Sequence, residues 1–280
     1  MTGVRLEVDT HIITANTTSV RNIDRVFQQE AGVGINSLVF AGLASSLSVL
    51  TDTEKELGVV MVDIGAGITN ICIFVDGALA YSSVIPIGAR HITNDLAIGL
   101  RISLESAEKI KLYLSAKYGK KSQGGDEETG DEMDLSELRL VEDLKKVSKK
   151  TLIDGIIRPR LNELFTMIGL ELKKSGFATQ TPAGLVIAGG GARTIGASES
   201  AKRMLSMPVR IGTPAHLTGL IDDVENSSFA TAVGLLCYGR NFATVAEQGG
   251  MLEGVFSMFS GKSFGGVTGK AKKLLKNFIP

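Results

Sequence analysis

The stretch VVMVDIGAGITNICIFV, residues 59–75, sets the architecture that we expect for this chain. Two apolar runs of strand length are joined by a D-x-G-x-G turn, which predicts a tight hairpin of two buried strands. Glycine reaches positive φ without a Cβ penalty, so Gly65 and Gly67 can take that conformation in the turn. Such a turn points successive backbone N–H groups into one concavity, an anion nest suited to β- and γ-phosphates. The alternative is an ordinary hairpin with an aspartate–glycine turn.

Two polar side chains flank this turn. Asp63 stands at the end of the first strand, where its carboxylate would hold a magnesium-bound water. Thr69 opens the second strand and would add a hydroxyl donor. The hairpin therefore predicts a site for a phosphorylated ligand with its magnesium ion.

A second glycine-rich turn lies far along the chain, in LVIAGGGARTIGA, residues 185–197. Its pattern is a strand, the triplet Gly189, Gly190 and Gly191, and the opening of a helix. Glycines let the backbone approach a ligand closely and leave helix N-terminal amides exposed. The triplet is neither a GxGxxG fingerprint nor a Walker loop, which would need Lys and Ser or Thr after its last glycine.

Between the two glycine motifs, IGARHITNDLA (residues 87–97) reads as another strand-to-helix turn. The following helix, in SAEKIKLYL, carries Glu108 and Lys111 three residues apart on one face. These two side chains would bracket a ribose and a purine. The alternative is an ion pair on the solvent side of a helix, worth a few tenths of a kcal/mol.

Composition narrows the class of protein. The chain has 280 residues, 44% of them hydrophobic, and its 30 Lys and Arg balance its 30 Asp and Glu, so no charge field for nucleic acid is expected. Cys72 and Cys237 lie in apolar runs and are predicted to be buried free thiols of a reducing compartment, without metal-ligand spacing to a histidine. With no signal pattern and no long apolar run, we expect a cytoplasmic, peripheral protein.

Hydrophobic periodicity predicts the remaining elements. Thr51 and Glu54 have the spacing of a capping box. The polar, acidic run 119–134 is expected to be a solvated loop in an inserted subdomain. We expect strands at 4–14, 38–40, 59–63, 68–75, 78–85 and 184–188, and helices at 20–32, 44–50, 92–100, 104–118, 135–146 and 157–174.

The C-terminal residues 264–280, FGGVTGKAKKLLKNFIP, have the pattern of a short basic amphipathic helix. On an anionic membrane each lysine would contribute about 1 kcal/mol, and the apolar face would be buried in the interface. The alternatives are a helix packed on its own domain or one that docks on a partner. The residues predicted to meet the membrane are Val267, Lys270, Lys272, Lys273, Leu274, Leu275, Lys276 and Phe278.

The order of these motifs resembles the actin and heat-shock-chaperone ATPases, and within them the FtsA family of actin-like bacterial cell division proteins. The resemblance is carried by residues 40–71, 209–220 and 230–239 and by the basic C-terminus. It implies an α/β actin-like ATPase (ribonuclease H-like) fold, in which mixed sheets are flanked by helices, with inserted subdomains and a C-terminal amphipathic helix.

The resemblance also implies a role for each motif, with ATP and Mg²⁺ as cofactors. Glu108 and Lys111 would line the adenosine pocket, and Gly189, Gly190 and Gly191 would face the α-phosphate and base. Within RPRLNELF (residues 158–165), Arg160 and Asn162 would contact the C-terminal tail of FtsZ. The second phosphate loop would consist of Asp63, Gly65, Ala66, Gly67 and Thr69.

The family pattern further implies a chain that begins inside the FtsA-specific subdomain 1C. The first phosphate hairpin would then be missing, so ATP binding would be weakened and a sheet edge would be open to self-association. We expect Met1 to be an internal methionine of a longer protein. The implied parts are the end of subdomain 1C at 1–35, a remnant of the first lobe at 36–57, the second lobe at 58–240 with an insertion near 98–175, a tether at 241–263 and the membrane helix at 264–280.

The leading interpretation is a non-enzymatic, ATP-binding adaptor. It would tether FtsZ filaments to the inner face of the cytoplasmic membrane at the division septum, form filaments itself and recruit later division proteins. Its expected partners are therefore the FtsZ tail, copies of itself, anionic lipids and those proteins, but not nucleic acid. The alternatives are an actin-superfamily small-molecule kinase and a pilus-assembly actin homologue.

Overall fold

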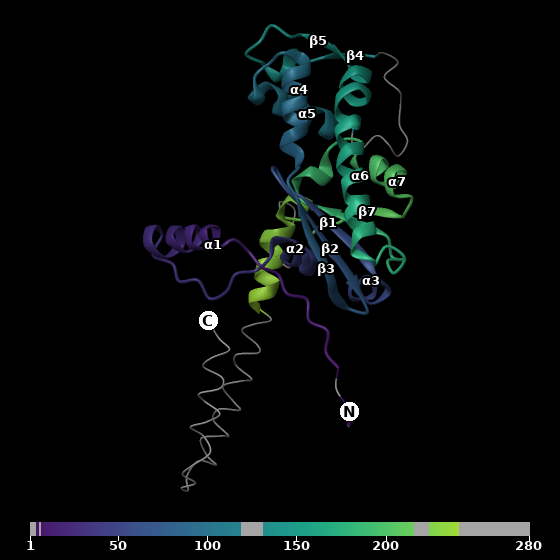
Figure 1. The fold of residues 1–280 in the computed structure, drawn as a ribbon. Helices are drawn as coiled ribbons and strands as arrows, with labels where there is room; N and C mark the ends of the chain where they lie inside the picture. The colour runs from purple at the N-terminus through teal and green to yellow at the C-terminus, as the bar shows by residue number, and fades with distance from the viewer. Residues whose placement is uncertain (1–3, 6, 119–130, 216–223, 241–280) are drawn as a thin grey trace. The chain divides into compact units, whose positions relative to one another are not determined.

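The computed structural model describes residues 4–5, 7–118, 131–215 and 224–240 (Figure 1). The chain divides into two compact units, residues 1–237 and 238–280. The predicted tether at 241–263 and the predicted membrane helix at 264–280, with all of its membrane residues, lie outside the described residues. So does most of the predicted acidic loop.

A mixed sheet of five strands forms the centre of the first unit (Figure 1). Its strand order is β3-β2-β1-β6-β7, with antiparallel pairing from β1 to β3 and parallel pairing from β1 through β6 to β7. Four of these strands are predicted from the sequence, and their ends agree to within one residue. The strands are β1 Val59–Ile64, β2 Thr69–Val75, β3 Ala78–Ile85, β6 Leu185–Ala188 and β7 Val209–Ile211.

Side-chain alternation along the strands gives the sheet two apolar faces. On β1, Val60, Val62 and Ile64 belong to the larger core, whereas Val59 and Met61 belong to the smaller one. The same alternation places Asp63 on the face of the smaller core. Every residue of β1 is buried, as expected for a central strand covered on both sides.

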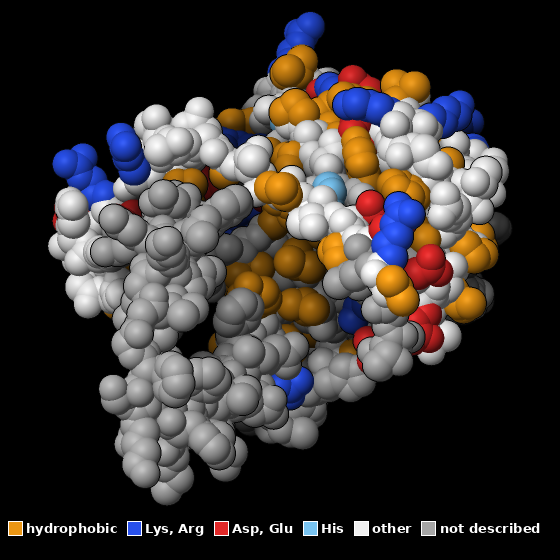
Figure 2. All heavy atoms as spheres, turned by 60° about the horizontal axis from the view of Figure 1, so that its bottom comes forward, with side chains coloured by type: hydrophobic (Ala, Val, Ile, Leu, Met, Phe, Trp, Pro, Cys, Tyr) orange, Lys and Arg blue, Asp and Glu red, His pale blue; other side chains and the backbone are white. Residues whose placement is uncertain are grey.

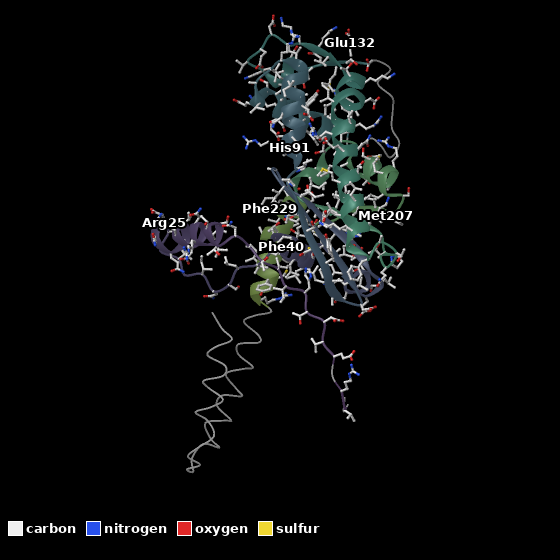
Figure 3. All side chains as sticks on the ribbon, in the orientation of Figure 1. Arg25, Phe40, His91, Glu132, Met207 and Phe229 are labelled. Carbon is white, nitrogen blue, oxygen red and sulfur yellow. The ribbon has the colours of Figure 1, made fainter. Side chains whose placement is uncertain are left out.

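Helices cover both faces of the sheet (Figure 1). The larger core contains residues of α4 Ala89–Leu100, α5 Leu104–Tyr118, α6 Arg158–Ser175 and α7 Ala197–Leu205. On the opposite face lie α2 Ala41–Val49 and the helical residues 230–237, and Phe40 and Phe229 mark their starts in Figure 3. The remaining elements are α1 Thr17–Asp24, η1 Arg25–Glu30, α3 Asp52–Leu57, β4 Glu132–Asp134, η3 Ser136–Leu138, β5 Lys146–Ser148, η4 Thr151–Ile157, η5 Gly190–Arg193 and η6 Ser227–Phe229.

The predicted helix over 135–146 is wrong. Arg139 takes a left-handed φ of +45°, which ends a short 3-10 turn. Glu142 accepts hydrogen bonds from Ser106 Oγ (2.6 Å) and Ser103 N (2.7 Å), and these bonds lower the pKa of Glu142 to about 2. The segment is therefore held irregular across the start of α5, and a two-stranded β4–β5 sheet flanks it.

The predicted strands at 4–14 and 38–40 are also wrong. The described residues of both segments are irregular, because no neighbouring strand supplies a hydrogen-bonded ladder. The helix predicted over 20–32 is confirmed as α1 and η1, and the capping box is confirmed, with Glu54 N donating to Thr51 Oγ1 and Thr51 N to Glu54 Oε2.

Large apolar side chains remain exposed on the described surface, and Figure 2 shows such side chains grouped among polar ones. Several belong to residues 4–38, and two others are Leu235 and Leu236 of the C-terminal described helix. Apolar atoms make up much of the surface of any folded domain, so these side chains carry no functional argument by themselves.

The two helices on the smaller face pack with their backbones in contact. A Cβ added at Gly234 would collide with the Ala44 carbonyl of α2. Ser48 Oγ of α2 also donates to the carbonyl of Ala230 at 2.7 Å. This close approach requires glycine at position 234.

We expect Gly234→Ala to lower the free energy of unfolding by about 1–3 kcal/mol, because overpacking against a backbone outweighs the roughly 1 kcal/mol that alanine gains in a helix. Gly239→Ala is the matched control in the same helix, since a Cβ there meets no atom within 4 Å. Urea unfolding of both variants measures the difference. Equal stability of the two variants would contradict this packing argument.

Candidate functional site

A cavity of about 520 Å³ opens where the β1–β2 turn meets two helices and the glycine-rich loop. Five parts of the chain, distant in sequence, contribute to its lining. They are Gly65 and Ala66 of the turn; Ala89, Arg90, Thr93 and Asn94 of α4; Leu104, Glu105, Glu108, Lys111, Leu112, Ser115 and Ala116 of α5; Gly190, Gly191, Arg193 and Thr194 of the glycine loop; and Ser228.

The hairpin turn is closed by a backbone hydrogen bond. Neither Gly65 nor Gly67 takes the positive φ that glycine allows. Gly65 N donates to Ile68 O at 2.9 Å, and a Cβ at Gly65 would lie only 3.0 Å from the same oxygen. A Cβ at Gly67 would meet no atom within 4 Å, so the space beside this residue is open.

The start of α4 is docked onto this turn. Ala89 N donates to Gly65 O at 2.9 Å, and Arg90 N donates to Ala66 O at 2.8 Å. A Cβ at Gly88 would stand 2.5–2.6 Å from the backbone atoms of the turn, so only glycine permits this approach. His91, labelled in Figure 3, folds back on Gly88, whose N–H lies 3.1 Å from His91 Nδ1.

Asp63 and Thr69 do not line the cavity. Asp63 faces the smaller core, where its Oδ2 accepts hydrogen bonds from Ser45 Oγ (2.7 Å) and Thr231 Oγ1 (3.0 Å). The Thr69 hydroxyl is fully buried and donates to Ile87 O at 2.7 Å. The prediction that this hydroxyl is available to a phosphate is therefore corrected: it anchors the chain just before α4.

Glu108 and Lys111 do lie together in the cavity, and Thr93 of α4 joins them. Lys111 Nζ donates to Glu108 Oε2 (2.7 Å) and to Thr93 Oγ1 (2.9 Å), and Thr93 Oγ1 donates to Glu108 Oε2 (2.5 Å). Burial alone would raise the pKa of Glu108, but the hydrogen bonds from Lys111 and Thr93 outweigh it and lower this pKa. The structure thus contains the predicted ion pair, and it lies within a ligand-sized cavity.

The Lys111 side chain is only 8% exposed, and that of Glu108 is 43% exposed. A buried ammonium is tolerated when it is paired and hydrogen-bonded, as this one is. The carboxylate therefore presents the accessible edge of the pair to the cavity.

The glycine triplet follows β6 as predicted, and it leads through η5 into α7. Gly189 has a φ of +82°, and a Cβ there would collide with the Asp63 carboxylate. Gly191 packs on Ile64, with no room for a side chain. Gly190 and Gly191 line the cavity, whereas Gly189 lies outside the lining and packs against Asp63 and Ile64 of β1.

The lining residues that sequence reasoning missed include four polar ones: Arg90, Thr93, Ser115 and Arg193. Ser115 Oγ accepts a hydrogen bond from Ile195 N (3.2 Å) and so ties the glycine loop to α5. The two arginines lie within the quoted motifs at 87–97 and 185–197, and a basic residue at such a turn was the available signal. Nothing in the local sequence links Thr93 to α5, because that contact depends on the packing of the two helices.

The two predicted FtsZ-contact residues lie apart. Arg160 forms a bidentate pair with Asp95 of α4 (2.5 and 2.8 Å) and also donates to Glu163, in a second cavity of about 250 Å³. Hydrogen bonding to Asp95 raises the pKa of Arg160. Asn162 instead accepts from Arg203 of α7 at 2.7 Å. The two side chains therefore point to different neighbours of α6.

The cysteines and histidines form no metal centre among the described residues. Cys72 is fully buried, and this burial raises the pKa of its thiol to about 12, so it stays protonated. Both cysteines are free, as predicted, but Cys237 is only partly buried.

The family model "Cell division protein FtsA" matches residues 60–234 of this chain. The FtsA of Pseudomonas aeruginosa is 38% identical over 243 residues, which cover 85% of this chain and 55% of that protein. The FtsA of Neisseria meningitidis serogroup B is 39% identical, over 84% of this chain and 55% of that protein. The chain thus spans about half the length of the curated relatives it matches.

Solved structures give the same fold. MreB5 of Spiroplasma citri bound to AMPPNP superposes with a TM-score of 0.64 at 16% identity, over 84% of this chain and 68% of that one. A PilM–PilN type IV pilus biogenesis complex superposes with a TM-score of 0.57 at 18% identity. The match covers 79% of this chain and 57% of that one. No helix within the described residues is both long and apolar enough to cross a membrane. The chain has the actin-like ATPase fold and belongs to the FtsA family of cell division proteins.

Proposed function

We propose that this chain is the nucleotide-binding part of an actin-like cell division adaptor, with ATP as its ligand. One observation carries the proposal: the hairpin turn, the start of α4, the Glu108–Lys111 pair and the glycine loop line a single cavity. Its volume of about 520 Å³ is that of a pocket for a small organic ligand. The fold relative MreB5 has AMPPNP bound, which is consistent with this assignment.

The ligand would lie along the cavity with its phosphates at the hairpin turn. Its ribose and base would lie between α5 and the glycine loop, where Glu108 offers a carboxylate to ribose hydroxyls and Gly190 and Gly191 offer flat backbone. The phosphates of bound ATP would bring negative charge that neutralises the positive charge of the cavity lining. We propose no catalytic role for these residues: the nucleotide sets the assembly state, and any hydrolysis is weak.

Asp63 does not fit a direct protein ligand for Mg²⁺ in this cavity. The Asp63 carboxylate is 5% exposed and accepts two hydroxyl hydrogen bonds on the other side of β1. Magnesium would therefore have to be held by phosphate oxygens and water, which is common for this ion. No step of the proposal depends on it.

The adaptor part of the proposal rests on the family. We propose that the region around Arg160 and Asn162 grips the FtsZ tail and that residues 264–280 bind anionic lipid at the inner face of the membrane at the septum. Filaments would form by self-association, for which β3 and β7, the outer strands of the described sheet, offer edges. Later division proteins would join this assembly.

A pilus-assembly role is the second candidate, since the PilM–PilN complex has a related fold. The family match of residues 60–234 favours cell division instead. A small-molecule kinase is disfavoured by the same match.

We expect Lys111→Met to weaken ATP binding by about tenfold or more, because it removes a charge-assisted hydrogen-bond network that orients Glu108. Titration of the purified chain with a fluorescent ATP analogue measures the change. Lys109→Met is the matched control, since Lys109 lies on the same helix, pairs with Glu105 and does not line the cavity. Equal affinity of both variants and the parent would contradict the site.

We expect the full chain to float with anionic vesicles, and a chain ended after Ser263 to stay in solution. The reason is that the four lysines of residues 264–280 would each contribute about 1 kcal/mol near an anionic surface. Flotation on vesicles with and without anionic lipid, at low and high salt, measures the difference. A full chain that stays in solution on anionic vesicles would refute the membrane part of the proposal.

A further inference from the structure

Two arginine side chains in the cavity have no partner among the residues that the structure describes. Arg90 stands at the start of α4, and Arg193 ends η5 after the glycine triplet. Both are exposed, and neither forms a hydrogen bond or an ion pair through its guanidinium with any residue that the structure describes. Other arginines of the same unit, such as Arg160 and Arg210, are paired with carboxylates.

The other charges of the cavity are already balanced. Glu108 is paired with Lys111 at 2.7 Å, and Glu105 is paired with Lys109 at 2.9 Å. Each carboxylate of the lining thus has its own lysine, so the two guanidinium groups are in excess. A concave site with uncompensated positive charge attracts an anionic ligand.

The backbone donors at the start of α4 are not available to that ligand. Ala89 N, Arg90 N and His91 N donate to carbonyl oxygens of Gly65, Ala66 and Gly88. The usual anion site at a helix N-terminus is therefore occupied by the hairpin turn itself. The Thr69 hydroxyl is also bonded to the backbone. Among the described lining residues of the turn and of α4, the cationic group is therefore the Arg90 guanidinium.

The two arginines belong to different segments of the cavity lining. Arg90 is fixed to the turn by its own N–H, which donates to Ala66 O. Arg193 belongs to the glycine loop, which Ile195 N ties to Ser115 of α5. A ligand with phosphates at the turn would meet Arg90 with its polyphosphate and Arg193 with its nucleoside.

We propose that Arg90 is the residue that makes this site prefer nucleoside di- and triphosphates over monophosphates and nucleosides. Its planar guanidinium binds two phosphate oxygens at once and stays charged at any physiological pH. Arg193 instead contacts the nucleoside and contributes equally to all adenine ligands. This inference rests on the proposed function, since it names the Arg90 guanidinium as the group that binds the phosphates of the proposed ligand.

The test compares Arg90→Gln with Arg193→Gln in the full chain, with ATP, ADP, AMP and adenosine as ligands in calorimetric titrations. For Arg90→Gln we expect a loss of at least about tenfold for ATP and ADP and less than about twofold for adenosine, since one charge-assisted pair is removed. For Arg193→Gln we expect a similar loss for all four ligands. Arg90→Lys keeps the positive charge but cannot bind two phosphate oxygens at once. It should therefore recover part of the affinity for ATP and ADP that Arg90→Gln loses.

Salt dependence gives an independent readout. Removal of a phosphate contact should flatten the fall of ATP affinity with salt in Arg90→Gln but not in Arg193→Gln. If the parent binds ATP and Arg90→Gln binds it equally well, the inference is overturned and the proposed function stands. A parent chain that binds none of the four ligands would overturn both. Circular dichroism tests whether each variant is folded. If Arg90→Gln does not fold, Arg90→Lys is compared with Arg193→Gln in its place.

Discussion

The rest of the site depends on the docking of one turn onto one helix start. Two hydrogen bonds, from Ala89 N to Gly65 O and from Arg90 N to Ala66 O, join the β1–β2 turn to α4. Gly88 permits this approach because it has no Cβ. The contact satisfies backbone groups at both ends, and it places Arg90 and Thr93 on the wall of the cavity.

The cluster of Thr93, Glu108 and Lys111 then connects α4 to α5. A buried lysine is unfavourable unless its charge is compensated, and here one carboxylate and one hydroxyl compensate it within 2.7–2.9 Å. The cluster therefore stabilises the helix pair and also leaves a carboxylate edge facing the cavity. The Glu-x-x-Lys pair is thus part of a hydrogen-bonded network between two helices, and its contact with a ribose and a purine stays a prediction.

The sequence predicts the parts of this site better than their orientation. Strand length, glycine placement and the Glu108–Lys111 spacing identify the hairpin, the glycine loop and the helix. The partners of Asp63 and Thr69 could not be predicted, because Ser45 and Thr231 are distant in sequence and Ile87 meets Thr69 only once β3 is paired. The helix predicted at 135–146 fails for a similar reason: the contacts of Glu142 with Ser103 and Ser106 form only after folding.

Asp63 illustrates how the two faces of the sheet share one strand. Its carboxylate accepts a hydrogen bond from Ser45 of α2 and another from Thr231 of the helical residues 230–237, and those two hydroxyls lie 2.7 Å apart. The next residues of the same strand lead directly into the turn that lines the cavity. A displacement of the turn along β1 would therefore disturb a buried charge held by two hydroxyls, which is costly because buried charges need their hydrogen bonds. The strand thus gives the helix pair on one face and the cavity on the other a common rigid support.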